Sequence, residues 1–410
     1  MAKKPNKDLM VGIDIGTSKV VAIVAEMVND NKLNIIGLGS HPSQGLKRGV
    51  VVNIESTVQS IQKAVEEAEH SAGCQIYSAF TGIAGSHIRS VNSHGIVAIR
   101  DREVTQLDID RVIDAAKAVA IPADQKILHI LPQEYIIDGQ DSIREPLGMS
   151  GVRLEVKVHI VTGAVSAAQN IVKCMKRCGL VASDIVLEQF ASSQSILADD
   201  EKELGVCMID IGGGTTDVAI FTHGSIRYTS AIPIAGDQVT NDIAVALRIP
   251  TRNAEEIKIN HGSALQDLTD PNEVIELPNV GDKSGRSITK RGLAEIVEAR
   301  YEELFELVSD EIYHSGLQDA IVSGVVLTGG ASKVDGAAKL AEKVFKVPVR
   351  VGSPQNLSGL SAIMDNPIYA TGVGLLHYGS QQRDSNNEVL ISPGMKNLWG
   401  KMKGWFQGNF

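Results

Sequence analysis

The chain has 410 residues, of which 43% are hydrophobic and 21% are charged, and its formal net charge is -10. This length and apolar content predict a globular protein with two or more domains, and the acidic balance argues against general nucleic-acid binding. The N-terminus lacks the apolar core of a secretory signal, and no stretch reaches the roughly twenty uncharged apolar residues of a membrane-spanning helix. We therefore expect an intracellular protein, at most peripheral to a membrane.

The first long apolar stretch, residues 11–25, contains Asp14 near the end of a predicted strand, followed by a short polar turn. The turn offers a flexible backbone, two hydroxyl groups and an ammonium group, in the order Gly16, Thr17, Ser18 and Lys19. Backbone without a Cβ lets successive N–H groups converge on an anion. The stretch therefore predicts a strand, a phosphate-binding turn and a second strand.

Residues 85–162 predict a small α/β module. Strand-like patterns occupy residues 131–139 and 151–163, and a helical pattern at 109–119 follows the possible N-caps Asp108 and Asp110. An ordinary structural module without an assembly role is the alternative interpretation.

A second strand-turn-strand unit lies at residues 208–221, between Asp210 and the strand that begins near Asp217. Its turn is formed by Gly212, Gly213, Gly214, Thr215 and Thr216. The alternative is a β-hairpin whose glycines only form the turn, but three consecutive glycines exceed what a two-residue hairpin needs. Because the unit repeats the pattern around Asp14, we expect two similar domains that each offer a phosphate loop to one cleft.

Asp14 and Asp210 each lie near the end of a buried strand, where a carboxylate is costly unless it is paired. A magnesium ion with its waters is the natural partner of a nucleotide phosphate. We therefore expect these two residues to hold Mg²⁺ mainly through water.

A third glycine turn follows the apolar strand at residues 325–328 and contains Gly329, Gly330 and Ala331. Paired glycines at a strand-to-helix turn allow the backbone to approach a flat ligand closely, so we assign this turn to the adenosine half of a nucleotide. No G-x-x-x-x-G-K-[ST] sequence occurs, which excludes a Walker-type site.

The three loops together resemble those of the actin, sugar kinase and heat-shock chaperone ATPase superfamily. The resemblance implies an α/β, actin-like, two-lobed ATPase fold that binds ATP, with residues 187–193 and 369–374 as two connecting helices at the hinge. It places Gly236 at a ribose and phosphate turn and directs Glu255 and Lys258 toward the adenosine. Glu188 is the candidate to orient an attacking water, and a hydrogen-bonded hinge carboxylate is the alternative.

Residues 85–162, by their sequence and by their position in the chain, are similar to subdomain 1C of the FtsA family of bacterial cell-division proteins. We expect gammaproteobacterial members of this family to be relatives of the chain. The match runs from about residue 9 to the C-terminus. The implied division is subdomain 1A at 8–84, 163–203 and 357–380, subdomain 1C at 85–162, subdomain 2A at 204–242 and 303–356, and subdomain 2B at 243–302.

The resemblance implies a protein that polymerises on the inner face of the cytoplasmic membrane at the division site, tethers FtsZ filaments there and contacts other division proteins. Weak ATPase activity at most is expected. A small-molecule kinase or a chaperone-type ATPase on the same fold is the alternative.

In subdomain 2B, the resemblance implies a site for the C-terminal tail of FtsZ. Basic side chains suit an acidic peptide, and the candidates are Arg286, Lys290, Arg291 and Arg300. A solvated helix face with ordinary ion pairs is the equally weighted alternative.

The chain ends with a predicted flexible linker at residues 381–393 and an amphipathic helix at 394–410. The apolar face consists of Met395, Leu398, Trp399, Met402, Trp405 and Phe406, and the flanking lysines are Lys396, Lys401 and Lys403. A helix docked on the protein's own core is the alternative, but aromatic residues flanked by lysines without any acid favour an anionic membrane surface. One such tail should bind marginally, whereas several on one polymer should bind firmly.

Overall fold

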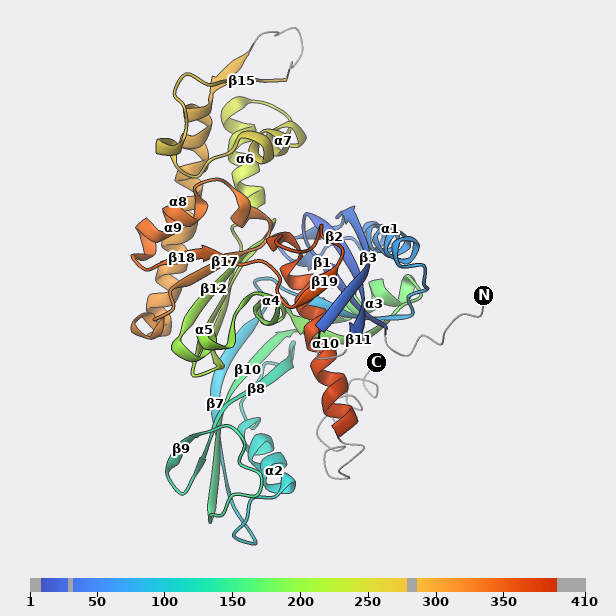
Figure 1. Cartoon of the computed structure of the whole chain (residues 1–410), viewed down its shortest axis with the longest axis vertical. Helices are drawn as coiled ribbons and strands as arrows, with labels where there is room; N and C mark the ends of the chain where they lie inside the picture. The colour runs from blue at the N-terminus through green and yellow to red at the C-terminus, as the bar shows by residue number, and fades with distance from the viewer. Residues whose placement is uncertain (1–8, 29–31, 279–285, 389–410) are drawn as a thin grey trace.

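The computed structural model describes residues 9–28, 32–278 and 286–388. Two α/β lobes lie side by side in the middle of an elongated molecule, with a helical subdomain at one end and a separate sheet at the other (Figure 1). Within the described residues, no helix combines the length and the apolar character that crossing a membrane requires. The two-lobed α/β architecture expected from the sequence is confirmed.

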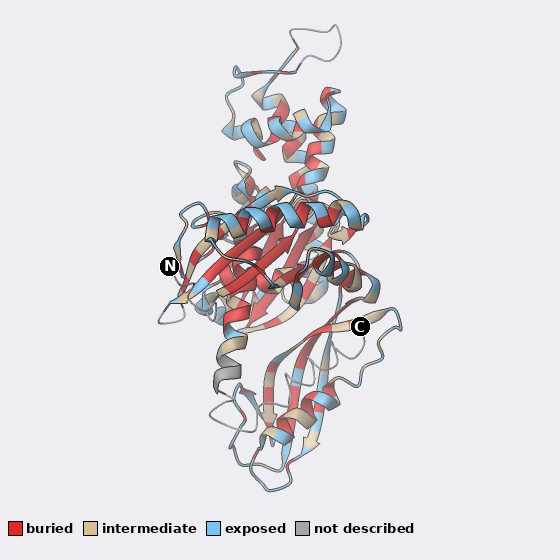
Figure 2. Cartoon of the chain, turned by 90° about the vertical axis from the view of Figure 1, so that its right-hand side faces the viewer, coloured by how far each residue is buried: buried red, intermediate tan, exposed pale blue. Residues whose placement is uncertain are grey.

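The first lobe is built on a sheet with the strand order β11-β6-β1-β2-β3-β19. Successive side chains of β2 point to opposite faces of this sheet. Val20, Ala22 and Val24 pack against helices α1 and α3 on one face. Val21 and Ile23 pack against α10 on the other. Figure 2 shows this buried sheet behind the exposed outer face of α1. The elements are β1 (Leu9–Ile15), β2 (Lys19–Val28), β3 (Lys32–Pro42), β4 (Leu46–Lys47), β5 (Val50–Val51), α1 (Ile54–Ala72), β6 (Ser78–Ile83), α3 (Val165–Arg177), β11 (Val181–Leu187), α4 (Glu188–Ile196), β19 (Leu357–Gly359), η4 (Pro367–Tyr369) and α10 (Ala370–Glu388).

The second lobe has the strand order β14-β13-β12-β17-β18, which repeats the order β3-β2-β1-β6-β11 of the first lobe. In both lobes the first three strands are antiparallel and the last two run parallel to the central strand. Asp14 and Asp210 therefore occupy equivalent positions, as the repeat predicted. The elements are α5 (Asp199–Leu204), β12 (Val206–Ile211), β13 (Thr216–Thr222), β14 (Ser225–Ile232), η2 (Gln318–Ala320), β17 (Val325–Thr328), η3 (Gly330–Lys333), α9 (Ala337–Phe345) and β18 (Val349–Val351).

The helical end of the molecule lies beyond the second lobe and is joined to it by one long helix, α8 (Lys290–Ser315) (Figure 1). Thr289 caps this helix, because its hydroxyl accepts a hydrogen bond from Gly292 N at 3.1 Å. The other elements are α6 (Gly236–Leu247), α7 (Thr251–His261), η1 (Gln266–Leu268), β15 (Val274–Glu276) and β16 (Ser287–Thr289).

The opposite end is the insert, an antiparallel sheet in the order β7-β10-β8-β9 with one helix packed on it. Its elements are β7 (Arg89–Ala98), α2 (Gln106–Ala116), β8 (Gln125–Ile137), β9 (Gln140–Ile143) and β10 (Arg153–Ala164). The helix begins earlier than its apolar pattern indicated, so the caps expected at Asp108 and Asp110 are wrong. The N-cap is Thr105, and Asp108 completes a capping box because its carboxylate accepts a hydrogen bond from Thr105 N at 3.1 Å.

The insert is covalently continuous with the first lobe but also contacts the edge strand β14 of the second lobe. Four polar insert residues form these contacts, which we call the insert seam: Ser90, Asn92, Gln133 and His159. Ser90 Oγ donates to Thr229 O at 3.1 Å, Asn92 Nδ2 to Arg227 O at 3.1 Å, and Gln133 Nε2 to Ile226 O at 3.0 Å. The seam therefore satisfies carbonyl groups of β14 that face no other strand.

The last helix extends beyond its predicted end. α10 continues to Glu388, eight residues into the segment that was expected to be a flexible linker from residue 381. The helix continues past residue 380 because residues 380–392 contain neither glycine nor proline to stop it. The remaining linker residues and the predicted amphipathic helix at 394–410 lie outside the described residues.

Candidate functional site

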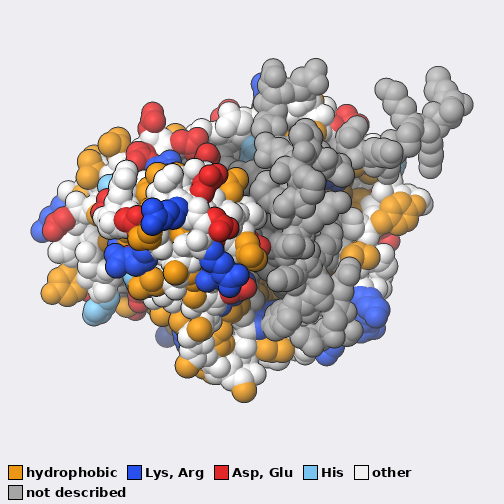
Figure 3. Space-filling model, turned by 90° about the horizontal axis from the view of Figure 1, so that it is seen from below, with side chains coloured by type: hydrophobic (Ala, Val, Ile, Leu, Met, Phe, Trp, Pro, Cys, Tyr) orange, Lys and Arg blue, Asp and Glu red, His pale blue; other side chains and the backbone are white. Residues whose placement is uncertain are grey.

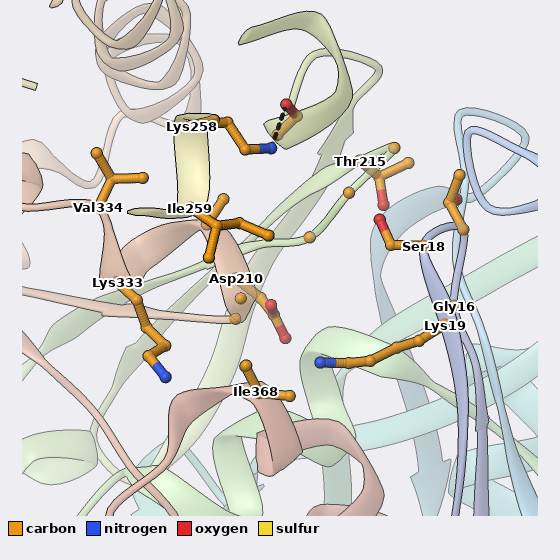
Figure 4. A pocket seen from close by; sticks show the side chains of 18 of the residues that line it. Gly16, Ser18, Lys19, Asp210, Thr215, Lys258, Ile259, Lys333, Val334 and Ile368 are labelled. Atoms are coloured by element: carbon orange, nitrogen blue, oxygen red, sulfur yellow. Dashed lines mark hydrogen bonds between the residues drawn. The ribbon is translucent and has the colours of Figure 1, made fainter. Parts of the chain in front are cut away.

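A cavity of about 650 Å³ lies between the two lobes. It is lined by both predicted phosphate loops, by the predicted adenosine loop and by the start of α6. Figure 4 shows Ser18 and Lys19 entering it from the first lobe, Asp210 and Thr215 from the second, and Lys258 from α7 of the helical end. The structure thus brings three segments that are far apart in the sequence to one place.

The two phosphate loops approach each other so closely that only glycine fits between them. A Cβ on Gly213 would lie 1.9 Å from Ser18 Oγ, and a Cβ on Gly214 would lie 2.6 Å from Thr17 Oγ1. The second loop is also fixed to the N-terminus of α6, because Asp237 N donates to Gly213 O at 2.8 Å. These glycines therefore allow close contact between the lobes as well as a phosphate-binding backbone.

Six carboxylates and four lysines line the cavity, and the acids Asp14, Asp210, Asp217 and Glu188 lie close enough together to affect one another. Burial, followed by the repulsion of Asp210, raises the pKa of Asp14 to about 7, and the same two causes raise the pKa of Asp217 to about 7. Burial also raises the pKa of Asp210 and, well above its ordinary value, that of Glu188. Burial also lowers the pKa of Lys19, the lysine whose charge acts on Asp14 and Asp210.

A hydrated divalent cation fits this excess of acid. Asp217 Oδ1 is buried without a hydrogen-bond partner, and Asp14 and Asp210 raise each other's cost of ionisation. Among the described residues, no group of three His, Cys, Asp or Glu side chains is close enough to hold a metal ion directly. The two aspartates therefore suit a cation such as Mg²⁺ that keeps most of its water ligands.

Glu188 is the first residue of α4 and lines the cavity. Its side chain lies against Gly82 of β6, where a Cβ would come within 2.7 Å of Glu188 Cγ. The raised pKa favours the protonated carboxyl group in this environment. Glu188 is thus placed near the phosphate loops as expected, with a carboxylate that is more basic than that of an ordinary glutamate.

On the adenosine side, Lys258 Nζ donates to Gly236 O at 3.0 Å and to Thr240 Oγ1 at 2.8 Å, and pairs with Glu255 at 2.7 Å. These contacts hold α6 and α7 together at the cavity wall. Three apolar residues at this wall were not expected as site residues, and Figure 4 shows them around the opening: Ile259, Val334 and Ile368.

All but one of the predicted nucleotide-binding residues line the cavity. The exception is Thr216, whose hydroxyl donates to Ile234 O at 2.7 Å and which does not line the cavity. The cavity lining also contains residues that the sequence did not indicate as site residues, among them Asp217, Lys333 and Thr371. Only Asp217 had a sequence signal, because it directly follows the glycine turn.

The four basic residues proposed for peptide binding do not form one free patch. Lys290 lines the nucleotide cavity and pairs with Glu273 at 3.0 Å, and Arg300 pairs with Asp242 at 2.6 Å. Arg286 donates to Leu247 O. Arg291 is exposed at the start of α8. The alternative of ordinary ion pairs therefore accounts for Lys290 and Arg300.

Seen from the insert end, the described surface mixes apolar, basic and acidic side chains (Figure 3). On the insert, five large apolar side chains are exposed, namely Val91, Ile96, Leu107, Leu147 and Val152. Such residues are available for contact with another protein.

Two family models match this chain. One is described as "Cell division protein FtsA" and matches residues 207–374, and the other is described as "SHS2 domain inserted in FTSA" and matches residues 85–162. The second range spans the same residues as the predicted insert.

Curated relatives match over the full length. A cell division protein FtsA of Pseudomonas aeruginosa is 59% identical over 417 aligned residues, covering 100% of both chains. The FtsA of Neisseria meningitidis is 49% identical, covering 97% of this chain and 98% of the relative. The FtsA of Escherichia coli K12 is 42% identical, covering 100% of both.

Solved structures with a similar fold are more distant in sequence. A PilM-PilN type IV pilus biogenesis complex matches with a TM-score of 0.67 and 16% identity, over 92% of this chain and 99% of that chain. MreB5 of Spiroplasma citri bound to ADP matches with a TM-score of 0.57 and 15% identity, over 94% and 99%. At such identities the likeness shows the fold alone, which is the actin-like arrangement predicted from the loops.

Proposed function

The chain belongs to the FtsA family of cell division proteins, and we propose that it binds ATP between its lobes, polymerises on the inner face of the cytoplasmic membrane and tethers FtsZ filaments there. The observation that carries the nucleotide part is the cavity where two duplicated phosphate loops and the glycine-rich adenosine loop meet. Division proteins that bind the insert are the expected further partners.

In this proposal the backbone N–H groups of Gly213 and Gly214 and the hydroxyl of Thr17 bind the phosphates. Gly212 N already donates to Thr215 O at 2.9 Å, and Thr215 Oγ1 donates to Asp217 Oδ2 at 2.9 Å, so these two groups shape the loop. A bound Mg²⁺ ion would supply positive charge for the phosphates and for the carboxylates of the cavity. Asp14 and Asp210 would hold the water shell of that ion from the two lobes. Because one ligand would touch both lobes, ATP would favour the closed arrangement and act as a switch.

We propose weak ATPase activity at most. Glu188 is the residue placed to orient a water, but no arginine lines the cavity in the described part of the chain to stabilise the developing charge. A single-turnover assay tests this, and rapid hydrolysis that depends on Glu188 would contradict it.

The membrane part of the proposal rests on the sequence of residues 394–410. Six large apolar side chains at about 1.5 to 3 kcal/mol each, with about 1 kcal/mol per lysine from anionic lipid, give a substantial gross gain. Ordering the tail costs much of this, so polymerisation would add the avidity that firm binding needs.

For the FtsZ tail, Arg291 is the candidate of the four basic residues without an assigned intramolecular role, because Lys290 and Arg300 already pair with acids. A charge-reversing Arg291→Glu variant should weaken binding of an acidic FtsZ C-terminal peptide. Unchanged peptide affinity would remove Arg291 from the proposal.

Liposome sedimentation tests the tether. Deletion of residues 394–410 should abolish pelleting with anionic vesicles but leave ATP affinity unchanged. Trp399→Glu replaces a large aromatic side chain of the apolar face with a charge and should also release the protein. Asn397→Glu is the matched control, because the same charge lies on the opposite face of the predicted helix. Pelleting that survives the deletion would overturn the tether.

A further inference from the structure

Two hydroxyl groups that the sequence did not indicate as site residues form hydrogen bonds with the carboxylate of Asp210. Ser192 Oγ in α4 donates to Asp210 Oδ2 at 2.6 Å, and Thr371 Oγ1 in α10 lies 3.4 Å from the same oxygen. The two hydroxyls are 3.0 Å apart. All three side chains are buried, so these hydrogen bonds form where water does not compete.

The other carboxylate oxygen of Asp210 faces the opposite side. A Cβ on Gly329 would come within 2.3 Å of Asp210 Oδ1, so this oxygen lies directly against the adenosine loop. One oxygen is therefore hydrogen-bonded to the crossing helices and the other packs beside the cavity. The carboxylate is held in one orientation by contacts on both sides.

The donors belong to the two helices that form the junction between the lobes. α4 lies in the chain between strand β11 of the first lobe and strand β12 of the second, and α10 packs against it. The helices cross so closely that a Cβ on Gly374 would lie 1.8 Å from Ala191 O. A side chain beside this crossing contacts both lobes at once.

We propose that Ser192 is a positioning residue for the cation of the nucleotide site, which it serves by orienting Asp210 and by connecting this carboxylate to the crossing helices. The inference rests on the proposed ATP and magnesium site. Because Ser192 Oγ binds Oδ2, Oδ1 is kept on the side of the adenosine loop, beside the cavity. Thr371 supports the same oxygen over a longer distance.

Ser195 offers a matched control on the same helix. Its hydroxyl is also buried and also joins α4 to α10, since it donates to Ala370 O at 2.7 Å. Its hydrogen bonds go to Ala370 O and, at 2.9 Å, to Ser192 O, and not to Asp210. Ser192→Ala and Ser195→Ala therefore remove equivalent hydroxyl groups, of which only one reaches the carboxylate.

The experiment measures ATP affinity of the full chain by calorimetry with Mg²⁺ and with EDTA. A hydrogen bond to a charged group of this kind corresponds to about a tenfold change in affinity. Ser192→Ala should therefore weaken binding about tenfold with Mg²⁺ but leave the affinity in EDTA unchanged, whereas Ser195→Ala should keep the Mg²⁺ dependence of the wild type. Ser192→Thr, which retains the hydroxyl, should recover at least part of the Mg²⁺-dependent affinity.

The outcomes distinguish the positioning role of Ser192 from the proposed cation site itself. If Ser192→Ala keeps the full Mg²⁺ dependence, or if Ser195→Ala loses it equally, the positioning role is wrong although the ATP site remains. If the wild type itself binds ATP equally well with Mg²⁺ and with EDTA, the proposed cation site fails and the role of Ser192 fails with it.

Discussion

Buried polar side chains join the two lobes at two places, the nucleotide cavity and the insert seam, and the two places differ in how their groups are matched. In the cavity, Asp14, Asp210, Asp217 and Glu188 lie close together, and burial raises the pKa of all four acids. In the seam, His159 Nδ1 lies 2.8 Å from Asn92 Oδ1, and Nε2 lies 3.0 Å from Thr229 Oγ1.

The difference indicates which place needs a ligand. Asn92 Oδ1 only accepts hydrogen bonds, so His159 donates through Nδ1 and accepts the Thr229 hydroxyl through Nε2. The neutral ring is thereby satisfied within the protein. The guanidinium Nε of Arg227 is a seam atom that lacks a partner. A cavity of clustered buried acids suits a cation, whereas a seam whose polar groups are largely matched suits a structural contact.

The largest expected effect tests the cavity side of this comparison. Asp210→Asn keeps the shape and an acceptor for Ser192 but removes a charge beside Asp14. We expect the affinity for ATP with Mg²⁺ to fall about a hundredfold or more, because a buried charge contact is lost. The unliganded protein should melt at the same or a higher temperature, since repulsion between two carboxylates is relieved.

Asp242→Asn is the control for this variant, because Asp242 pairs with Arg300 in the same half of the molecule but does not line the cavity. It should leave ATP affinity unchanged. Wild-type affinity in Asp210→Asn would show that the excess of acid in the cavity has another cause.

The next effect concerns the seam. His159→Ala leaves Asn92 Oδ1 and the Thr229 hydroxyl short of a partner and opens a small cavity. We expect the free energy of unfolding to fall by about 2 to 3 kcal/mol, while ATP affinity changes by less than about threefold. Denaturant unfolding and calorimetry measure the two quantities.

The control is His94→Ala in the same sheet, where the side chain is 42% exposed and pairs with Glu155. Exposed substitutions usually stay within about 0.5 kcal/mol. If His159→Ala reduced ATP affinity as much as Asp210→Asn does, the seam would be part of the nucleotide site and the contrast would fail.

The charge state of the seam predicts a pH effect. Burial lowers the pKa of His159 from 6.5 to about 4, so the folded protein binds fewer protons than the unfolded chain between these values. The stabilisation is complete above pH 6.5 and is lost as the pH falls toward 4. Between pH 7 and 4.5 the loss should be about 2 kcal/mol in the wild type relative to His159→Gln. Parallel stability curves for the two proteins would show that His159 does not remain neutral.

The sequence predicted the features that are local in the chain. Each phosphate loop is a strand, a glycine turn and a strand, so residues 11–25 and 208–221 carry their own signal. The Asp210 anchors could not be found in this way, because Ser192 and Thr371 are 18 and 161 positions away from it and lie on helices with ordinary composition. The seam is equally hidden, since His159 and Thr229 are 70 positions apart.

The smallest expected effect examines how closely the lobes approach at the cavity. Gly213→Ala places a methyl group where Ser18 Oγ lies, at 1.9 Å in the present arrangement, so the two phosphate loops must separate slightly. We expect ATP affinity to fall about fivefold, because the backbone N–H groups of both loops no longer converge fully. The double variant Gly213→Ala with Ser18→Ala removes the obstructing hydroxyl and should recover part of the loss, whereas Ser18→Ala alone should change affinity less. A double variant that binds worse than both single variants would mean that Ser18 contributes to binding directly and that the close contact between the loops is not what Gly213 provides.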